Sequence, residues 1–240
     1  MHIMISDDAP LFHDLLAPRL LQRGIQVSQA RSIAETKAQL EQGLAPDVIL
    51  LDMDFSVAGE GGDESFAGLT AARSIRRRYP DIALLAMSKH DELRIALEMM
   101  NIGQQGGRIG YLLKDKLEGV TQLLEYARTV HAGGICIDAQ LKGLAARGGK
   151  LTVTQKKVVD LIARGYTNKA IAERLLISEG TVERHIASIR RAYRLPSPEE
   201  ERRLQMNLRV LIVRAYLSDI MGHKDHGWQA GGIPRPGRHV

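Results

Sequence analysis

The segment PDVILLD, residues 46–52, is the part of the sequence that decides the fold of the first half of the chain. Its residues 48–51 are all apolar, which is typical of a central strand that is buried on both faces of a parallel sheet. Further short apolar runs alternate with amphipathic stretches. The runs are 3–5, 25–28, 82–86 and 110–113, and the stretches are 11–23, 33–41, 69–79, 92–100 and 117–131. This alternation predicts an α/β domain with helices on both faces of a five-stranded parallel sheet.

Polar side chains follow four of the five predicted strands. Ligands of open parallel sheets gather at the carboxyl ends of the strands, and the residues there are Asp7, Asp8, Asp52, Ser88 and Lys114. Crowded carboxylates repel one another unless a cation lies between them, and Mg²⁺ prefers such oxygen ligands. Each residue alone has a structural interpretation, since Asp often caps a helix and a lone Ser or Lys is usually solvated. Their combination in this order predicts a site.

The motifs ISDD (5–8), PDVILLD (46–52) and GYLLKD (110–115), with Ser88, resemble the receiver domain of NarL/FixJ-type response regulators. The resemblance implies a flavodoxin-like, doubly wound domain in which a sensor histidine kinase phosphorylates Asp52. It also implies that Mg²⁺ is the cofactor, bound by Asp8, Asp52 and the main-chain carbonyl of Asp54, with Asp7 acting through water.

The same resemblance assigns the remaining site residues to a switch. Lys114 would contact the phosphoryl oxygens, Ser88 would move towards them, and Tyr111 would change rotamer with that movement. Such a site needs positioning and charge neutralisation rather than elaborate covalent chemistry. No enzymatic activity is therefore expected beyond phosphorylation and dephosphorylation of the receiver itself.

Three features depart from the family pattern. The segment 53–68, MDFSVAGEGGDESFAG, lacks the usual Met-Pro and is long, Lys89 stands where a small residue is common, and the stretch 101–109, NIGQQGGRI, is expanded. They motivate an alternative hypothesis, in which a ligand or partner, and not phosphorylation, gates an atypical response regulator. A remote alternative is a phosphatase similar to the haloacid dehalogenases, because Asp52 and Asp54 form an Asp-x-Asp pair. That family places this pair on its first strand, whereas here Asp7 and Asp8 come first.

Charge and helical pattern distinguish the second half of the chain. Residues 1–130 carry 14 Lys+Arg against 18 Asp+Glu, and residues 131–240 carry 19 against 10, so that only the second half suits a polyanion. Thr152 or Thr154 can cap a helix that ends at Gly165. Asn168 begins a second helix, and Ser178 can cap a third, which is typical of a helix-turn-helix.

Residues 151–195 resemble a LuxR-type DNA-binding domain over their whole length, mainly through NKAIAERL and ISEGTVERH. The resemblance implies that Lys169 and Thr181 contact phosphates of double-stranded DNA, and that the third helix faces bases in the major groove. The outward residues of that helix are Glu183, Arg184, Ala187, Ser188 and Arg191. Glu183 replaces a frequent lysine, so the recognised DNA sequence should differ from the common one.

A last helix is expected to reach about Ile220, with Leu204, Leu208, Leu211 and Ala215 on one apolar stripe. Packing of this stripe on its own domain and contact with a second copy are equally compatible with the pattern. The LuxR-type resemblance favours a homodimer through this helix. The Gly-, Pro- and His-rich tail that follows is expected to be disordered.

The chain is thus predicted to hold a receiver domain (1–132), a linker (133–150) with a short helix near 139–146, an all-α helix-turn-helix domain (151–220) and a tail (221–240). We interpret it as a transcriptional regulator of a two-component system, switched by phosphorylation. It has no apolar run of about 18 residues, no basic, apolar leader, and Cys136 as its single cysteine. These features predict a cytoplasmic protein that does not associate with membranes.

Overall fold

The computed structural model describes residues 1–55, 67–89, 93–104, 106–137 and 150–221. Its first part is a parallel sheet in the strand order β2-β1-β3-β4-β5-β6. The strands are β1 (His2–Ser6), β2 (Gln26–Ala30), β3 (Val48–Asp52), β4 (Ala83–Ser88), β5 (Ile109–Leu113) and β6 (Ile135–Ile137). The helices between them are α1 (Pro10–Leu21), α2 (Ile33–Glu41), α3 (Ala67–Arg78), α4 (Leu93–Ile102) and α5 (Val120–His131). The predicted α/β domain, with helices on both faces of a parallel sheet, is confirmed.

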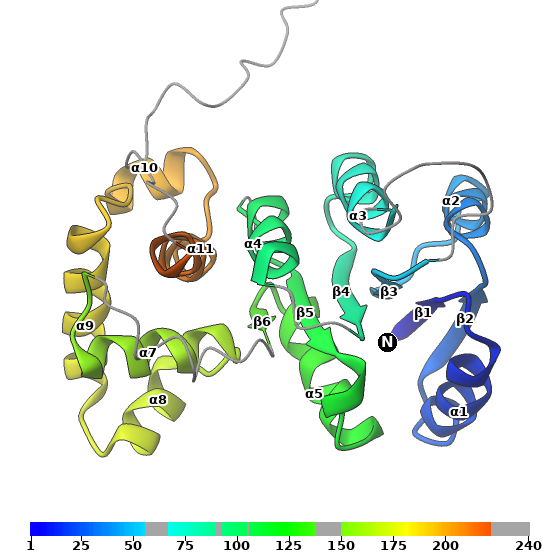
Figure 1. Cartoon of the computed structure of the whole chain (residues 1–240), viewed down its shortest axis with the longest axis horizontal. Coiled ribbons are helices and arrows are strands. Elements are labelled where there is room, and N and C mark those ends of the chain that lie inside the picture. The colour runs from blue at the N-terminus through cyan, green and yellow to red at the C-terminus, as the bar shows by residue number, and fades with distance from the viewer. Residues whose placement is uncertain (56–66, 90–92, 105, 138–149, 222–240) are drawn as a thin grey trace, which may run out of the picture.

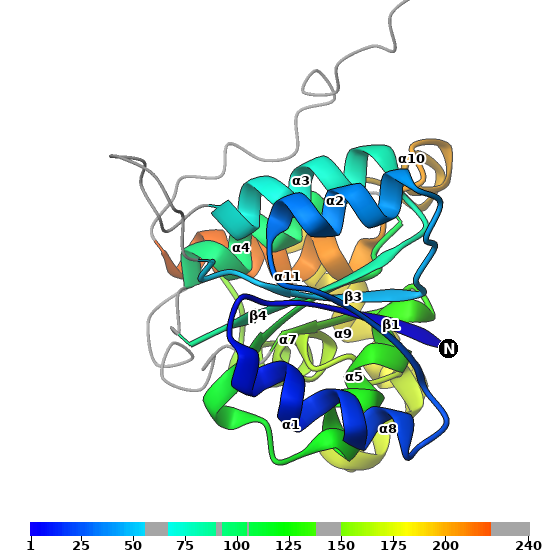
Figure 2. The same ribbon diagram turned by 90° about the vertical axis from the view of Figure 1, so that its right-hand side faces the viewer.

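Alternate residues of the central strands lie in two separate cores, because successive side chains of a strand point to opposite faces. Ile3 and Leu50 pack under α1 and α5, whereas Met4 and Ile49 pack under α2, α3 and α4. Figure 2 shows these two layers of helices above and below the sheet. The sheet therefore lies between two packed layers of helices.

Within the described residues the sheet has six strands, so the predicted number of five is wrong. The sixth, β6, pairs in parallel with β5 and lies within the segment that was predicted to be a linker. Only three apolar residues, Ile135, Cys136 and Ile137, form it, and two glycines precede it. Such a short run carries no alternation that would distinguish a strand from a loop. The short helix expected near 139–146 lies outside the described residues, as does the expected disordered tail from 222 onward.

Three capped helices form the helix-turn-helix. They are α7 (Val153–Ala163), α8 (Asn168–Leu175) and α9 (Glu179–Ala192). Thr152 is the cap of α7 and forms a capping box with Gln155. Thr167 caps α8 and Ser178 caps α9, each by accepting a backbone N–H three residues ahead. The expected order of helices and the start of α8 at Asn168 are confirmed.

The C-terminal region contains two helices where one was predicted. The first, α10 (Pro198–Arg203), ends before Gln205, whose φ of 51° is in the left-handed region. The second, α11 (Leu208–Ile220), begins after Asn207, whose side chain accepts from Arg209 N and Val210 N. Asn207 is a good N-cap, and its local hydrogen bonds explain why the chain starts a new helix here.

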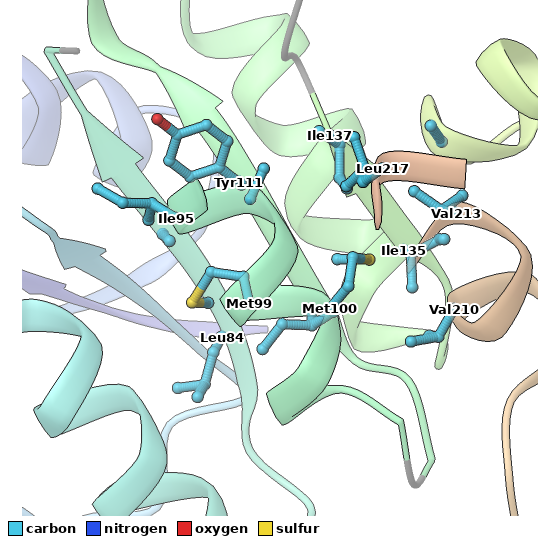
Figure 3. Packing of buried hydrophobic residues seen from close by; sticks show 14 of the residues in the cluster. Leu84, Ile95, Met99, Met100, Tyr111, Ile135, Ile137, Val210, Val213 and Leu217 are labelled. Atoms are coloured by element: carbon cyan, nitrogen blue, oxygen red, sulfur yellow. The ribbon is translucent and has the colours of Figure 1, made fainter. Parts of the chain in front are cut away.

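The two parts of the chain share one hydrophobic core. Helix α11 lies between α4 of the sheet domain and α7 of the helix-turn-helix, and α7 also contacts β6. Figure 3 shows Met100 of α4 beside Ile135 of β6, facing Val210 and Val213 of α11. Helix α11 is buried on all sides, because the four consecutive residues from Val210 to Val213 are buried and together cover one turn of the helix. A helix that is apolar on all sides belongs to an interior, so α11 is a core element of this arrangement.

Polar contacts accompany that interface, and they come from the expanded stretch 101–109. The Asn207 N–H donates to the Gln104 carbonyl at 3.0 Å, and the Gly106 N–H donates to the Gln205 carbonyl at 3.3 Å. Arg214 Nε donates to Asn101 Oδ1 at 2.7 Å. The stretch that departs from the family pattern is thus the segment that contacts the turn between α10 and α11.

Replacing Gly68 with alanine should destabilise the sheet domain. A Cβ at this position, in the first turn of α3, would lie 2.4 Å from the Asp52 carbonyl oxygen and 2.6 Å from Met53 Cα. Both neighbours are backbone atoms, so the expected cost is about 1–3 kcal/mol of unfolding free energy. Urea denaturation measures it. Gly180→Ala is the control, because nothing lies within 4 Å of its Cβ and alanine favours the helix by about 1 kcal/mol. Equal shifts for both variants would contradict the steric argument.

None of the helices in the described ranges is long and apolar enough to cross a membrane.

Candidate functional site

Three carboxylates meet at the carboxyl edge of the sheet. Asp7 and Asp8 follow β1, Asp52 ends β3, and one ligand atom from each lies within 4.8 Å of the other two. Asp7 and Asp52 are 1% and 2% exposed. Lys114, just after β5, places its Nζ 2.7 Å from Asp7 Oδ2 and 2.9 Å from Asp52 Oδ2. The strand ends bring together all four of these predicted site residues.

Lys114 offsets the free-energy cost of burying two carboxylates side by side. Burial raises the pKa of Asp52 above its ordinary value, while the charge of Lys114 acts in the opposite direction and that of Asp7 adds to the rise. Burial alone would lower the pKa of Lys114, but its hydrogen bonds and charge interactions with Asp7 and Asp52 outweigh burial and raise it. The site is therefore a coupled group of two acids and one base, with the base held in its charged form.

Two residues of α1 help to hold this group, and sequence reasoning missed both. His13, which is 1% exposed, shares a hydrogen bond of 2.6 Å between its Nε2 and the Asp7 carbonyl oxygen. The Phe12 ring centroid lies 5.0 Å from Lys114 Nζ, within the range of a cation–π contact. A Phe-His pair on an amphipathic helix has no local pattern that distinguishes it from ordinary core residues, so no signal in the sequence could have identified it.

Asp54 binds the predicted switch residue. Ser88 Oγ donates to Asp54 Oδ2 at 3.2 Å, and the Lys89 N–H donates to the same oxygen at 2.8 Å. The Asp54 N–H in turn donates to Asp52 Oδ1 at 3.1 Å. The Asp54 side chain thus links the end of β3 to the end of β4, a contact that sequence reasoning did not foresee because it assigned Asp54 only a main-chain role. The Lys89 residue is exposed.

Tyr111 lies away from the acidic group, inside the core. It is fully buried on β5, and Figure 3 shows its ring beside Ile95 of α4. Helix α4 presents its opposite side to α11. A change in the position of Tyr111 would therefore alter the packing of α4, the helix that contacts the second domain.

The donor set fits Mg²⁺. The three carboxylates offer hard oxygen ligands close together, which is the chemistry this ion prefers. Lys114 neutralises part of the negative charge of the three carboxylates. The negative charge that remains can be neutralised by a bound cation. Asp8 is only half-buried, which leaves an approach from solvent.

The second predicted site is the outward face of α9, and the first domain leaves it open. Glu183, Arg184, Ala187 and Arg191 are exposed on this helix, and Lys169 is exposed at the start of α8. In Figure 1 α9 lies on the side of the helix-turn-helix that faces away from the sheet. The face that would meet base edges is therefore accessible in this arrangement.

Two predicted DNA-contacting side chains have partners within the domain. Ser188 Oγ accepts a hydrogen bond of 3.0 Å from Gln155 Nε2 of α7, so it lies towards α7. Thr181 Oγ1 accepts from Arg184 Nη2 at 2.8 Å and lies 2.9 Å from Ser178 Oγ. Thr181 therefore links the cap of α9 to the exposed Arg184.

The residues predicted to form a dimer contact are largely covered by the chain itself. Leu211 and Ala215 are 1% and 6% exposed, and Leu204 and Leu208 are half-buried. Leu204 is not on α11 at all, since it is the C-cap residue of α10. In the arrangement described here this stripe packs within the monomer.

Comparison with protein families matches both parts of the chain. Residues 3–126, slightly more than half of the chain, match the model described as the response regulator receiver domain. Residues 149–197 match the model described as bacterial regulatory proteins of the luxR family.

Curated relatives match across both domains. The chain is 26% identical over 207 residues to the transcriptional regulatory protein LnrK of Bacillus subtilis (strain 168), covering 78% of this chain and 88% of LnrK. It is 27% identical over 216 residues to the transcriptional regulatory protein DegU of Brevibacillus brevis, covering 79% and 86%. Among solved structures, a Salmonella typhimurium RcsB response regulator matches with a TM-score of 0.48 and 18% identity, over 91% of this chain and 98% of that one.

Proposed function

Because the chain belongs to the response-regulator receiver family and carries a LuxR-family domain after its receiver, we propose that it is a DNA-binding transcriptional regulator switched by phosphorylation of Asp52. The observation that carries this proposal is the buried group of Asp7, Asp52 and Lys114 at the sheet edge. The proposed partners are a sensor histidine kinase, double-stranded DNA and a second copy of the chain, and the proposed location is the cytoplasm.

The geometry supplies the parts that phosphoryl transfer needs. An oxygen of Asp52 would form the new bond to phosphorus as the bond between phosphorus and the donor breaks, and the donor keeps that electron pair. A magnesium ion held by Asp8, Asp52 and the Asp54 carbonyl, with Asp7 acting through water, would neutralise the charge of the transferred group. Lys114 would then exchange its contact with Asp52 Oδ2 for one with a phosphoryl oxygen.

The Asp54 side chain sets a requirement for switching. Ser88 Oγ is bound to Asp54 Oδ2 at 3.2 Å, so Ser88 has to leave this carboxylate before it can contact a phosphoryl group. The Lys89 N–H holds the same oxygen at 2.8 Å. Release of Ser88 would change the end of β4, which leads into α4, and α4 contacts both Tyr111 and α11. These contacts support the proposal that a change at Asp52 reaches the DNA-binding domain through α4.

Phosphorylation is tested by intact-mass measurement after incubation with acetyl phosphate and Mg²⁺. We expect one phosphoryl group on the wild type, none on Asp52→Asn, and one on Asp14→Asn, which removes an exposed carboxylate from α1. Omission of Mg²⁺ should abolish the modification of the wild type and of Asp14→Asn. An unmodified wild type, or modification of Asp52→Asn, would overturn the assignment of Asp52.

The alternative, gating by a ligand or partner, is distinguished from our proposal by the behaviour of Asp52→Asn. The stretch 101–109 contacts the α10–α11 turn, which gives it a role that does not involve the phosphorylation site. If Asp52→Asn binds DNA and dimerises like phosphorylated wild type, the alternative replaces our proposal. The matched families, a receiver and a LuxR-type domain, favour either form of regulator over a dehalogenase-like phosphatase.

A further inference from the structure

A cleft of about 770 Å³ lies between the receiver domain and the helix-turn-helix. The receiver lines it with the last turn of α5, including Arg128, and with residues at the start of β6. The second domain lines it with Lys169 at the start of α8, Glu179 at the start of α9, and Arg209 in the first turn of α11. The cleft therefore joins one end of the recognition helix α9 to a helix of the receiver.

The cleft has an excess of positive charge. Its lining includes the three cations Arg128, Lys169 and Arg209 and a single carboxylate, Glu179. Within the described part of the chain, none of the three cations forms an ion pair. Arg209 is held by neutral partners, since it donates to the Tyr166 carbonyl at 2.6 Å and to Asn168 Oδ1 at 2.7 Å. An anion in this cleft would thus meet three positive side chains that, in the described ranges, are not already paired with a carboxylate.

The backbone also contributes partial positive charge to the cleft. Helix α8 begins in the cleft at Asn168, with Thr167 as its cap. The first N–H groups of a helix lack partners within it, and its dipole places partial positive charge there. Thr167 satisfies only the Ala170 N–H. The cleft thus combines three side-chain cations from two domains with the positive end of a helix.

We propose that this cleft receives the phosphate backbone of the DNA bound to α9, and that Arg128 of the receiver is a direct phosphate contact. This inference rests on the proposed DNA binding. DNA is the fitting anion because the base-facing residues of α9 are exposed and Glu179, the first residue of that helix, lines the cleft. The N-terminal end of α9 would thus bring a DNA strand close to Arg128, Lys169 and Arg209 of the cleft. The receiver takes part in DNA binding in this arrangement.

The test measures binding of the full chain to a random 30-base-pair duplex over a series of salt concentrations. Arg128→Gln should weaken binding about twofold to fivefold at low salt, the effect of one exposed ion contact. It should also reduce the slope of log K against log salt by about 1, as expected for the loss of one phosphate contact. Arg128→Lys should keep the slope. Arg23→Gln is the matched control, because it removes one exposed arginine just after α1. Helix α1 lies on the side of the receiver away from the helix-turn-helix (Figure 1).

Three outcomes would overturn the inference. They are an unchanged slope for Arg128→Gln, an equal change for Arg23→Gln, or binding of inorganic phosphate in the cleft by calorimetry with no effect of Arg128→Gln on DNA. Failure of the proposed function looks different, because wild type would then not bind DNA at all. Arg184→Ala provides the internal reference, since it should weaken DNA binding whether or not Arg128 contributes.

Discussion

Replacing Lys114 with methionine is expected to destabilise the receiver domain at neutral pH by about 3–5 kcal/mol, the usual cost of removing one partner from a buried ion pair. Lys114 Nζ lies 2.7 Å from Asp7 Oδ2 and 2.9 Å from Asp52 Oδ2. Both carboxylates are almost fully buried, so without the lysine they face each other with no cation between them. The methionine side chain is similar in length to lysine and fills most of the same space. The variant therefore removes the charge of Lys114 while keeping most of its packing.

The destabilisation should depend on pH in a defined direction. Burial already raises the pKa of Asp52 above its ordinary value of 3.8, against the attraction of Lys114. A folded state with a raised carboxyl pKa holds its proton more tightly than the unfolded state does. The contribution of Asp52 to stability is therefore most favourable below 3.8 and falls as pH rises from there to the folded pKa. Without Lys114 the pKa of Asp52 in the folded state rises further, so the pH range over which this contribution is lost extends to higher pH.

Thermal unfolding over a pH series measures this effect. The deficit of Lys114→Met relative to wild type should be greatest near neutral pH and should shrink as the solution is acidified. Addition of Mg²⁺ at neutral pH should raise the melting temperature of the variant more than that of wild type, since ligand binding to the folded state stabilises it. Lys37→Met, which removes an exposed charge from α2, should show neither effect. A deficit that grew on acidification would contradict the carboxylate argument.

The sequence was sufficient to predict the residues that meet around Lys114, because the ends of the strands follow from local patterns. The apolar runs 48–51, 82–86 and 110–113 end at most two residues before the observed strand ends at Asp52, Ser88 and Leu113. Parallel pairing then places these ends at one edge. The cap Ser178 was predictable because capping acts over three residues, and Thr152 was one of two candidates for the cap of α7.

What the sequence could not predict depends on contacts between distant segments. The hydrogen bond from Ser88 to Asp54 joins two strand ends that are 34 residues apart, and no local pattern encodes it. The burial of Leu211 and Ala215 depends on where α4 lies, whereas an apolar stripe only shows that some surface covers it. The break between α10 and α11 required Gln205 to adopt a left-handed conformation, which is uncommon for a residue other than glycine.

Replacing Gly107 with alanine is expected to disrupt the packing of the receiver on the second domain. Gly107 has a φ of +68°, and a Cβ there would lie 2.4 Å from the Gly133 carbonyl oxygen and 2.6 Å from Asn207 Nδ2. Asn207 is both the N-cap of α11 and the donor of a 3.3 Å hydrogen bond to that carbonyl. The added methyl group therefore separates the two groups that join the domains here, at a cost of about 1–3 kcal/mol for overpacking.

Gly106→Ala is a closely matched control for Gly107→Ala. Gly106 has a φ of +77°, so alanine suffers the same left-handed backbone strain of about 1 kcal/mol, but nothing lies within 4 Å of its Cβ. Hydrogen exchange should therefore show faster exchange in α4 and α11 for Gly107→Ala than for Gly106→Ala. X-ray scattering should show a larger radius of gyration for the same variant. Equal behaviour of the two variants would mean that backbone strain alone acts, and that the contact with Asn207 does not hold the domains together.

The same pair of variants tests how the proposed dimer relates to the packed monomer. Leu211 and Ala215 of the predicted dimer stripe are buried within the chain, so a two-fold contact through them requires α11 to leave its present neighbours. If phosphorylation acts by weakening the contact between α4 and α11, Gly107→Ala should dimerise without phosphorylation, and Gly106→Ala should not. Sedimentation at several concentrations distinguishes these outcomes. The contrary outcome is a larger radius of gyration for Gly107→Ala by scattering together with a monomer at every concentration by sedimentation. In that case the stripe on α11 is a core surface only, and any dimer must form through another face.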